Sequence, residues 1–423
     1  MLGLAGSVIA ARALGPSGKG LYSSMVVLAL FIAHASFLGL GDAAMVMTGQ
    51  KRASYQRALS GGMAAAVVSG LAGMGLMWAA GSLAFAEDWG QARPAVLLTA
   101  LGVPAVIFGF HLISVLSAQE RIIAASVVYA CGTWVTTFVL AAVALGATLT
   151  LTRTALAGLV GALATGLVGA GFVIRGSRLS LKPSWDWGYL KPALKYGLPA
   201  QLSFLLTFAF LRADLLLVYF LAGAHLAGLY SVALTGAMVI ILFPAAVSAT
   251  TFPRLANLEE EPACHLLVRT FRLCLIGSAA AALLFMPAAA VAIPLLFGED
   301  FAPAVPATLV LALGGVVWSC QWVLCRGQAA RGRPGLQVRS FALTLIMMVG
   351  LDLVLIPLWG IDGAALASVL APAAGLAHAL AAYRRSGWWP LGLKVFAPRS
   401  RDVGEAYRLV GGLVRRRGTG GIV

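Results

Sequence analysis

Ionisable side chains stand inside otherwise apolar stretches of this 423-residue chain. Arg212 and Asp214 interrupt one such stretch, and Asp352 interrupts another. A charge at the depth of a lipid bilayer is costly, so these residues are candidates for a functional site. Arg212 could hold an anionic substrate in a cavity, or it could pair with Asp352 and only stabilise the fold. The sequence leaves both interpretations open.

Uncharged polar residues share helical faces with two of these charges. Asp214 falls on the same face as Ser203 and Thr207, and Arg212 falls on the same face as Gln201. Arg212 and Asp214 themselves are two positions apart and point in nearly opposite directions, so they are poorly placed to pair. The polar stripe predicts a water-filled cavity beside this helix.

Two further candidates lie in the first 40 residues. Arg12 and its neighbour Lys19 could steer a phosphate group at the outer mouth of a transporter, or they could extend to the membrane interface. His34 could be a proton site, or it could be a neutral packing residue. We keep Arg12 and His34 among the candidate cavity residues.

The sequence does not match the motifs of soluble enzymes that it superficially suggests. The segment GPSGKG at 15–20 has neither the spacing nor the Ser/Thr of a phosphate-binding loop. The five histidines include no HExxH, and the five cysteines have neither disulfide nor metal spacing. We therefore expect no enzyme, no cofactor and no metal. Transport would then draw on a proton or sodium gradient, or on the substrate's own fall in free energy.

The composition predicts a membrane protein. Hydrophobic residues make up 60% of the chain, charged residues 11%, and the mean hydropathy is +0.92. A soluble chain has about a quarter charged residues, so a cytosolic enzyme, a disordered chain and a secreted disulfide scaffold are excluded. The net charge of +15 would suggest a nucleic-acid partner in a soluble chain. Here the cations lie between apolar runs, so we expect no nucleic acid.

The apolar runs predict the topology. They fall at 1–14, 21–47, 59–84, 94–118, 122–147, 154–174, 196–221, 227–252, 270–296, 303–325, 336–357 and 362–383. With the N-terminus placed inside, 25 of the 30 Lys and Arg residues lie on the cytoplasmic side, four lie on the other side, and Arg212 lies within a span. The pattern therefore predicts twelve spans with both termini in the cytoplasm.

A short motif recurs after six spans. Gly-Leu-Tyr-Ser occupies 20–23 and again 228–231, and Gly15 matches Gly223 at the same offset. A weaker echo pairs Gln119 with Gln328. Because six is an even number of spans, the halves are parallel repeats. We predict an N-terminal lobe at 1–175, a basic cytoplasmic linker at 176–194, a C-terminal lobe at 195–384 and a basic amphipathic tail at 385–423 on anionic membrane lipids.

Several segments, in order, resemble polysaccharide and O-antigen flippases of the Wzx type. They are ARALGPSGKGLY at 11–22, LP at 198–199, RAD at 212–214, GLYS at 228–231, FPRL at 252–255, FGEDFAP at 297–303, and IP at 356–357 followed by GIDGAA at 360–365. Asp352 departs from the family, in which Asn is usual before the IP motif.

The resemblance implies the multidrug/oligosaccharidyl-lipid/polysaccharide (MOP) exporter superfamily. Its members are all-α polytopic membrane proteins with two six-helix lobes that alternate access around a central cavity. The flippase branch carries undecaprenyl-diphosphate-linked glycans to the outer leaflet of the bacterial inner membrane. Glycosyltransferases or a polysaccharide polymerase would be its partners. Two alternatives stay open, a drug/cation antiporter of the same superfamily and a membrane scaffold for glycosyltransferases.

Overall fold

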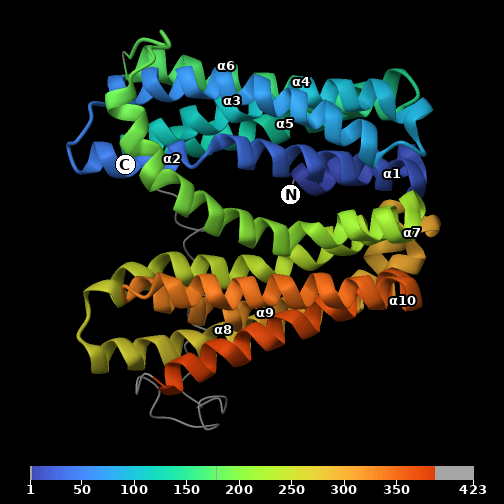
Figure 1. Ribbon diagram of the computed structural model, residues 1–423. Coiled ribbons are helices and arrows are strands. Elements are labelled where there is room, and N and C mark those ends of the chain that lie inside the picture. The colour runs from blue at the N-terminus through green and yellow to red at the C-terminus, as the bar shows by residue number, and fades with distance from the viewer. Residues whose placement is uncertain (1, 178, 386–423) are drawn as a thin grey trace, which may run out of the picture. The chain divides into compact units, whose positions relative to one another are not determined.

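The part of the chain that the structure describes folds almost entirely into helices (Figure 1). The structure is a computed structural model, and it describes residues 2–177 and 179–385. The elements of the first half are α1 (Leu2–Phe37), α2 (Leu40–Gly49), α3 (Tyr55–Ala84), α4 (Trp89–Ala118), α5 (Ile122–Gly146), α6 (Leu151–Gly171) and the π-helix η1 (Phe172–Gly176). Those of the second half are α7 (Trp187–Asn257), α8 (Glu260–Phe297), the 3-10 helix η2 (Glu299–Ala304), α9 (Val305–Ala330) and α10 (Pro334–Arg385).

Three long helices are broken at a glycine. Gly15 divides α1, Gly223 divides α7 and Gly360 divides α10, with φ values of 66°, 85° and 59°. Glycine adopts positive φ without the steric cost that a Cβ imposes. Within the described residues, nine helices are long and apolar enough to cross a membrane, and these three are among them. Divided at their glycines, the nine helices provide twelve apolar segments, so the predicted all-α polytopic fold is confirmed.

The described residues form two compact units. Unit 1 contains the residues up to 231 together with 296–300, and unit 2 contains 232–295 and the residues from 301 onwards. The predicted lobes at 1–175 and 195–384 and the linker at 176–194 stay predictions. The predicted amphipathic tail lies outside the described residues, apart from Arg385.

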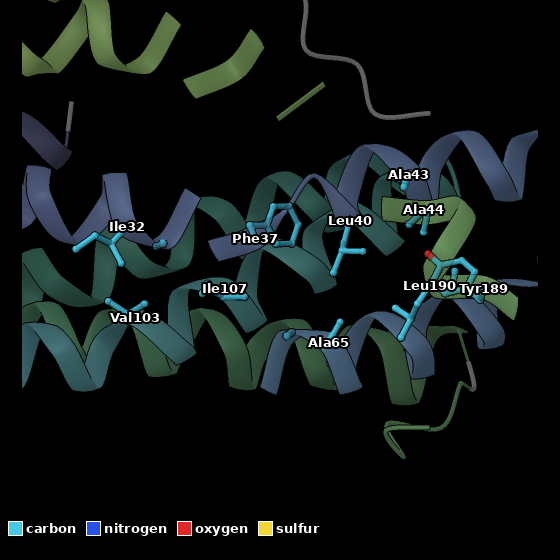
Figure 2. Packing of buried hydrophobic residues seen from close by; sticks show 14 of the residues in the cluster. Ile32, Phe37, Leu40, Ala43, Ala44, Ala65, Val103, Ile107, Tyr189 and Leu190 are labelled. Atoms are coloured by element: carbon cyan, nitrogen blue, oxygen red, sulfur yellow. The ribbon is translucent and has the colours of Figure 1, made fainter. Parts of the chain in front are cut away.

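The core of unit 1 joins five helices through apolar and small side chains (Figure 2). Ile32 and Phe37 of α1 lie in one buried cluster with Val103 and Ile107 of α4. Leu190 belongs to the same cluster, so the start of α7 packs with the helices of the first half. Alanines from α2, α3 and α4 complete the cluster and let the helix backbones approach closely.

The segment before α7 lies along the start of α3. Gln56 exchanges two hydrogen bonds of 2.8 Å with the backbone of Ser180. Arg57 forms an ion pair with Asp186, and its hydrogen bond holds the pKa of the Asp186 carboxyl below the usual value. These contacts connect the start of α3 to Ser180 and to Asp186, the residue that directly precedes α7.

The two copies of the repeated motif meet backbone against backbone in unit 1. A Cβ added to Gly20 would overlap the carbonyl oxygen of Ala224 and lie 2.5 Å from the backbone nitrogen of Gly228. A Cβ added to Gly228 would overlap the carbonyl oxygen of Pro16 and lie 3.1 Å from the backbone nitrogen of Gly20. We call this reciprocal contact of α1 and α7 the repeat crossing. Only glycine fits at its centre.

Unit 2 has its own core, built mainly on α8, α9 and α10. Phe271 and Phe341 are buried in it. The α9–α10 contact also carries polar bonds: Gln321 Nε2 donates to Thr344 Oγ1 at 2.6 Å, and the Tyr383 hydroxyl donates to the carbonyl oxygen of Leu324 at 3.0 Å. Both bonds start from one part of α9, and they reach the two segments of α10 before and after its break at Gly360.

The repeat crossing predicts a stability effect. Gly228→Ala should lower the free energy of unfolding by about 1–3 kcal/mol, because the added methyl group meets backbone atoms that cannot rotate away. Gly75→Ala is the matched control, since nothing lies within 4 Å of a Cβ at this position in α3. Unfolding of the purified protein in detergent measures both variants. Equal stabilities for the two would contradict a tight crossing.

Candidate functional site

Two positive charges in unit 1 act on each other electrostatically. Lys19 follows the break at Gly15 in α1, and only 6% of the residue is exposed. Arg212 projects from α7 and is partly buried, and its charge and that of Lys19 repel each other. Such a pair is costly without counter-charge, so it is suited to a group with two negative centres.

A carboxylate accompanies this pair of cations. Asp214 is buried in α7, and its charge attracts that of Arg212. Its Oδ2 accepts a hydrogen bond of 2.7 Å from the hydroxyl of Tyr230, and its Oδ1 accepts one of 2.8 Å from the backbone nitrogen of Leu215. Tyr230 belongs to the second copy of the repeated motif. The repeat crossing and the buried carboxylate are therefore adjacent features of α7.

His34 and Gln201 lie together, as parts of α1 and α7. Gln201 is buried, and its Nε2 donates to the carbonyl oxygen of His34 at 2.7 Å. The imidazole stacks on Phe110 with ring centroids 4.6 Å apart, and the rings of Phe204 and Phe208 lie at 4.6 and 5.2 Å. Three phenyl rings thus surround His34, which favours a packing role over a solvated proton site.

The other candidates from the sequence are more dispersed. Arg12 is exposed, and its Nε donates to the carbonyl oxygen of Leu296 at 2.7 Å. Thr207 is partly buried, and the side chain of Ser203 lies outside the described residues. Asp352 is fully buried in α10, in unit 2, whereas Arg212 lies in unit 1. The Arg212–Asp352 pair therefore stays a prediction.

Sequence reasoning did not place two residues in the site. The sequence places Lys19 only at the outer mouth, and it marks Tyr230 only as part of the repeated motif. The repeat could have indicated them, because residues of two related halves meet near the axis that the halves share. Residues close to the matched glycines are therefore candidates for contacts across the axis.

The family model of polysaccharide biosynthesis proteins matches residues 9–306. The chain belongs to this family. The match includes every candidate site residue of unit 1 and both copies of the repeated motif. No curated protein sequence matches the chain.

Solved structures share the fold at low sequence identity. An inward-facing multidrug resistance MATE transporter of the MOP superfamily has a TM-score of 0.78 at 17% identity, over 92% of this chain and 96% of that one. The lipid II flippase MurJ, inward closed, has a TM-score of 0.79 at 14% identity, over 97% and 90%. A MOP transporter from Pyrococcus furiosus has 0.61 at 15%, over 92% of each. The expected two-lobed fold of about twelve helices is confirmed.

The bond between Tyr230 and Asp214 can be tested directly. Tyr230→Phe should lower stability by about 1–3 kcal/mol, the usual range for a hydrogen bond to a charged, buried group. In combination with Asp214→Asn the loss should be smaller than the sum of the single losses, because both changes remove the same bond. Thermal unfolding in detergent provides these values.

Tyr22→Phe is the control for that experiment. Tyr22 occupies the equivalent position of the first repeat, and the described residues provide no hydrogen bond for its hydroxyl. This variant should unfold like the parent. Strictly additive losses for Tyr230→Phe and Asp214→Asn would show that the two side chains act independently.

Proposed function

We propose that this chain carries an undecaprenyl-diphosphate-linked oligosaccharide from the inner to the outer leaflet of the bacterial cytoplasmic membrane by alternating access. It is a multi-pass membrane protein of the MOP transporter or flippase type, and its family serves polysaccharide biosynthesis. A diphosphate and its sugars cannot cross about 30 Å of hydrocarbon unaided. A protein must provide polar groups in place of the water that hydrates the diphosphate and the sugars during the passage, while the prenyl tail stays in lipid.

The observation that carries this proposal is the pair of cations at Lys19 and Arg212. Two positive charges that act on each other suit a diphosphate, which spreads negative charge over two phosphorus centres. The planar guanidinium of Arg212 can bind phosphate oxygens through two parallel hydrogen bonds, and the ammonium of Lys19 adds a point charge. We assign the diphosphate to these two residues.

Asp214 is the proposed coupling or sugar contact. Its carboxylate is buried, and it already accepts a bond from Tyr230. Protonation would weaken its attraction for Arg212 and so change the hold on the diphosphate. A proton or sodium gradient could act through this residue.

The alternatives fit less well. A drug/cation antiporter needs cavity carboxylates without matching cations, whereas the charge of Asp214 is attracted by that of Arg212. A scaffold for glycosyltransferases would depend on the tail at 386–423, and removal of the tail would then abolish function with the helices intact. Glycosyltransferases and a polymerase stay proposed partners only.

Arg212 variants separate substrate binding from structural pairing. Arg212→Ala should reduce flipping of the lipid-linked glycan by roughly 30-fold or more, about 2 kcal/mol, because one charge facing the diphosphate is lost. Arg212→Lys should retain part of the activity, since the charge remains and the planar fork is lost. Arg93→Ala, at an exposed cation of α4, should be fully active. Flipping and detergent stability are measured together.

A purely structural pairing of Arg212 with Asp352 predicts a different result. If Arg212 is only the partner of Asp352, the Arg212→Ala variant should be unstable. Adding Asp352→Ala to it should then restore much of the lost stability in the double variant. Full activity of Arg212→Ala would also remove Arg212 from the binding role.

The proposed orientation is tested by reporter fusions. We expect fusions after Phe301 and Trp359 to report the periplasm, and fusions after Leu181 and Arg333 to report the cytoplasm, as the Lys and Arg distribution requires. Inversion at any of the four positions would contradict twelve spans with both termini inside.

A further inference from the structure

A small pocket opens at one end of unit 2, where α9 ends and α10 begins. It is lined by Glu260, Gln328, Arg331, Arg333, Leu336, Ala382 and Tyr383. The proposed topology assigns this end to the cytoplasm. The pocket is separate from the residues of unit 1 to which we assign the diphosphate.

Gln328 is the unusual residue of this pocket. It is 2% exposed, and neither Nε2 nor Oε1 of its side chain has a hydrogen-bond partner among the described residues. A buried amide without partners is destabilising, so its retention calls for an explanation. Gln119, its echo in the first half, differs: the Ser177 hydroxyl donates to its side-chain oxygen.

The hydrogen bonds that end α9 bring Gln328 and Arg333 next to each other. The nitrogen of Arg333 donates to the carbonyl oxygen of Gln328 at 3.0 Å, and that of Gly332 donates to Ala329 at 3.1 Å. Gly332 has a φ of 74°, so the helix ends in a Schellman motif. The two residues that the motif brings together are commonly apolar and pack on each other. Here both are polar and line the pocket.

Arg331 is fixed at the pocket wall by neighbouring backbone. Its Nη1 donates to the carbonyl oxygen of Leu258 at 2.5 Å and approaches that of Leu255 at 3.4 Å. The pocket therefore presents two guanidinium groups, one amide that can donate and accept, and the carboxylate of Glu260. This set fits a ligand with both an anionic oxygen group and hydrogen-bond donors.

We propose that this pocket binds a phosphodiester headgroup that carries hydrogen-bond donors, such as an ammonium or hydroxyl groups. Arg331, Arg333 and Nε2 of Gln328 donate to the phosphodiester oxygens. The donors of the headgroup reach the carboxylate of Glu260 and Oε1 of Gln328. The amide of Gln328 is thereby satisfied on both atoms when the pocket is filled. The basic tail that follows Arg385 has the wrong charge to fill it.

The experiment compares headgroups on the purified, full-length protein. Phosphatidylglycerol and phosphatidylethanolamine offer hydroxyl or ammonium donors, whereas phosphatidylcholine has the same phosphodiester and none. We expect mixed micelles of the first two to bind about tenfold more tightly than phosphatidylcholine, as judged by native mass spectrometry, because a charge-assisted hydrogen bond is lost. In a second set of measurements, soluble glycerophosphoglycerol and glycerophosphoethanolamine replace the lipids.

Three variants test whether the preference belongs to this pocket. Arg333→Ala and Gln328→Leu should abolish it, and Gln328→Leu should leave the empty protein at least as stable, since two unpartnered atoms are removed. Arg339→Ala, an exposed cation nearby in sequence but outside the lining, should retain it. If the soluble compounds bind as tightly as the lipids, the ligand is a soluble phosphodiester of the same chemistry. No preference over phosphatidylcholine, or a preference that persists in Arg333→Ala and Gln328→Leu, would overturn the proposal.

Discussion

The contact of two glycines, Gly20 and Gly228, constrains the candidate site more than any other interaction. Because no side-chain atom separates them, the backbones of α1 and α7 touch at the repeat crossing. Each helix is also broken nearby, at Gly15 and at Gly223, where the positive φ values redirect the chain. Lys19 directly precedes Gly20, so the crossing fixes this part of α1 against α7, and the charge of Lys19 interacts with that of Arg212. A larger residue at the crossing would separate the helices that carry the two charges.

The electrostatics of the site follow from this geometry. Two cations and one carboxylate lie among apolar helices, where water screens charges poorly. Asp214 is engaged by Tyr230 and offsets part of the positive charge, so an excess of positive potential is left for a ligand. A diphosphate would complement that excess. A cationic drug would add to it, which is the physical reason to prefer the flippase.

Sequence patterns predicted the fold well, because apolar runs and loop cations report directly on the bilayer. The repeat of Gly15 and Gly20 at Gly223 and Gly228 even marked two of the helix breaks and the crossing. The site was less predictable. The charge of Lys19 interacts with that of Arg212 although the two residues belong to distant segments of the chain, and helical periodicity cannot show this. The sequence indicated Gln328 only through its weak match to Gln119 in the repeat. Whether a buried amide has hydrogen-bond partners depends on packing, which the sequence does not show.

The central claim, that Lys19 and Arg212 hold a diphosphate, is tested most directly by binding. Undecaprenyl diphosphate and undecaprenyl monophosphate would compete for the purified protein in lipid nanodiscs, with Lys19→Gln, Arg212→Gln and the control Arg93→Gln beside the parent. The account predicts that the parent and Arg93→Gln prefer the diphosphate, and that either site variant loses most of this preference. Equal affinity of the parent for both lipids, or an undiminished preference in both site variants, would contradict it.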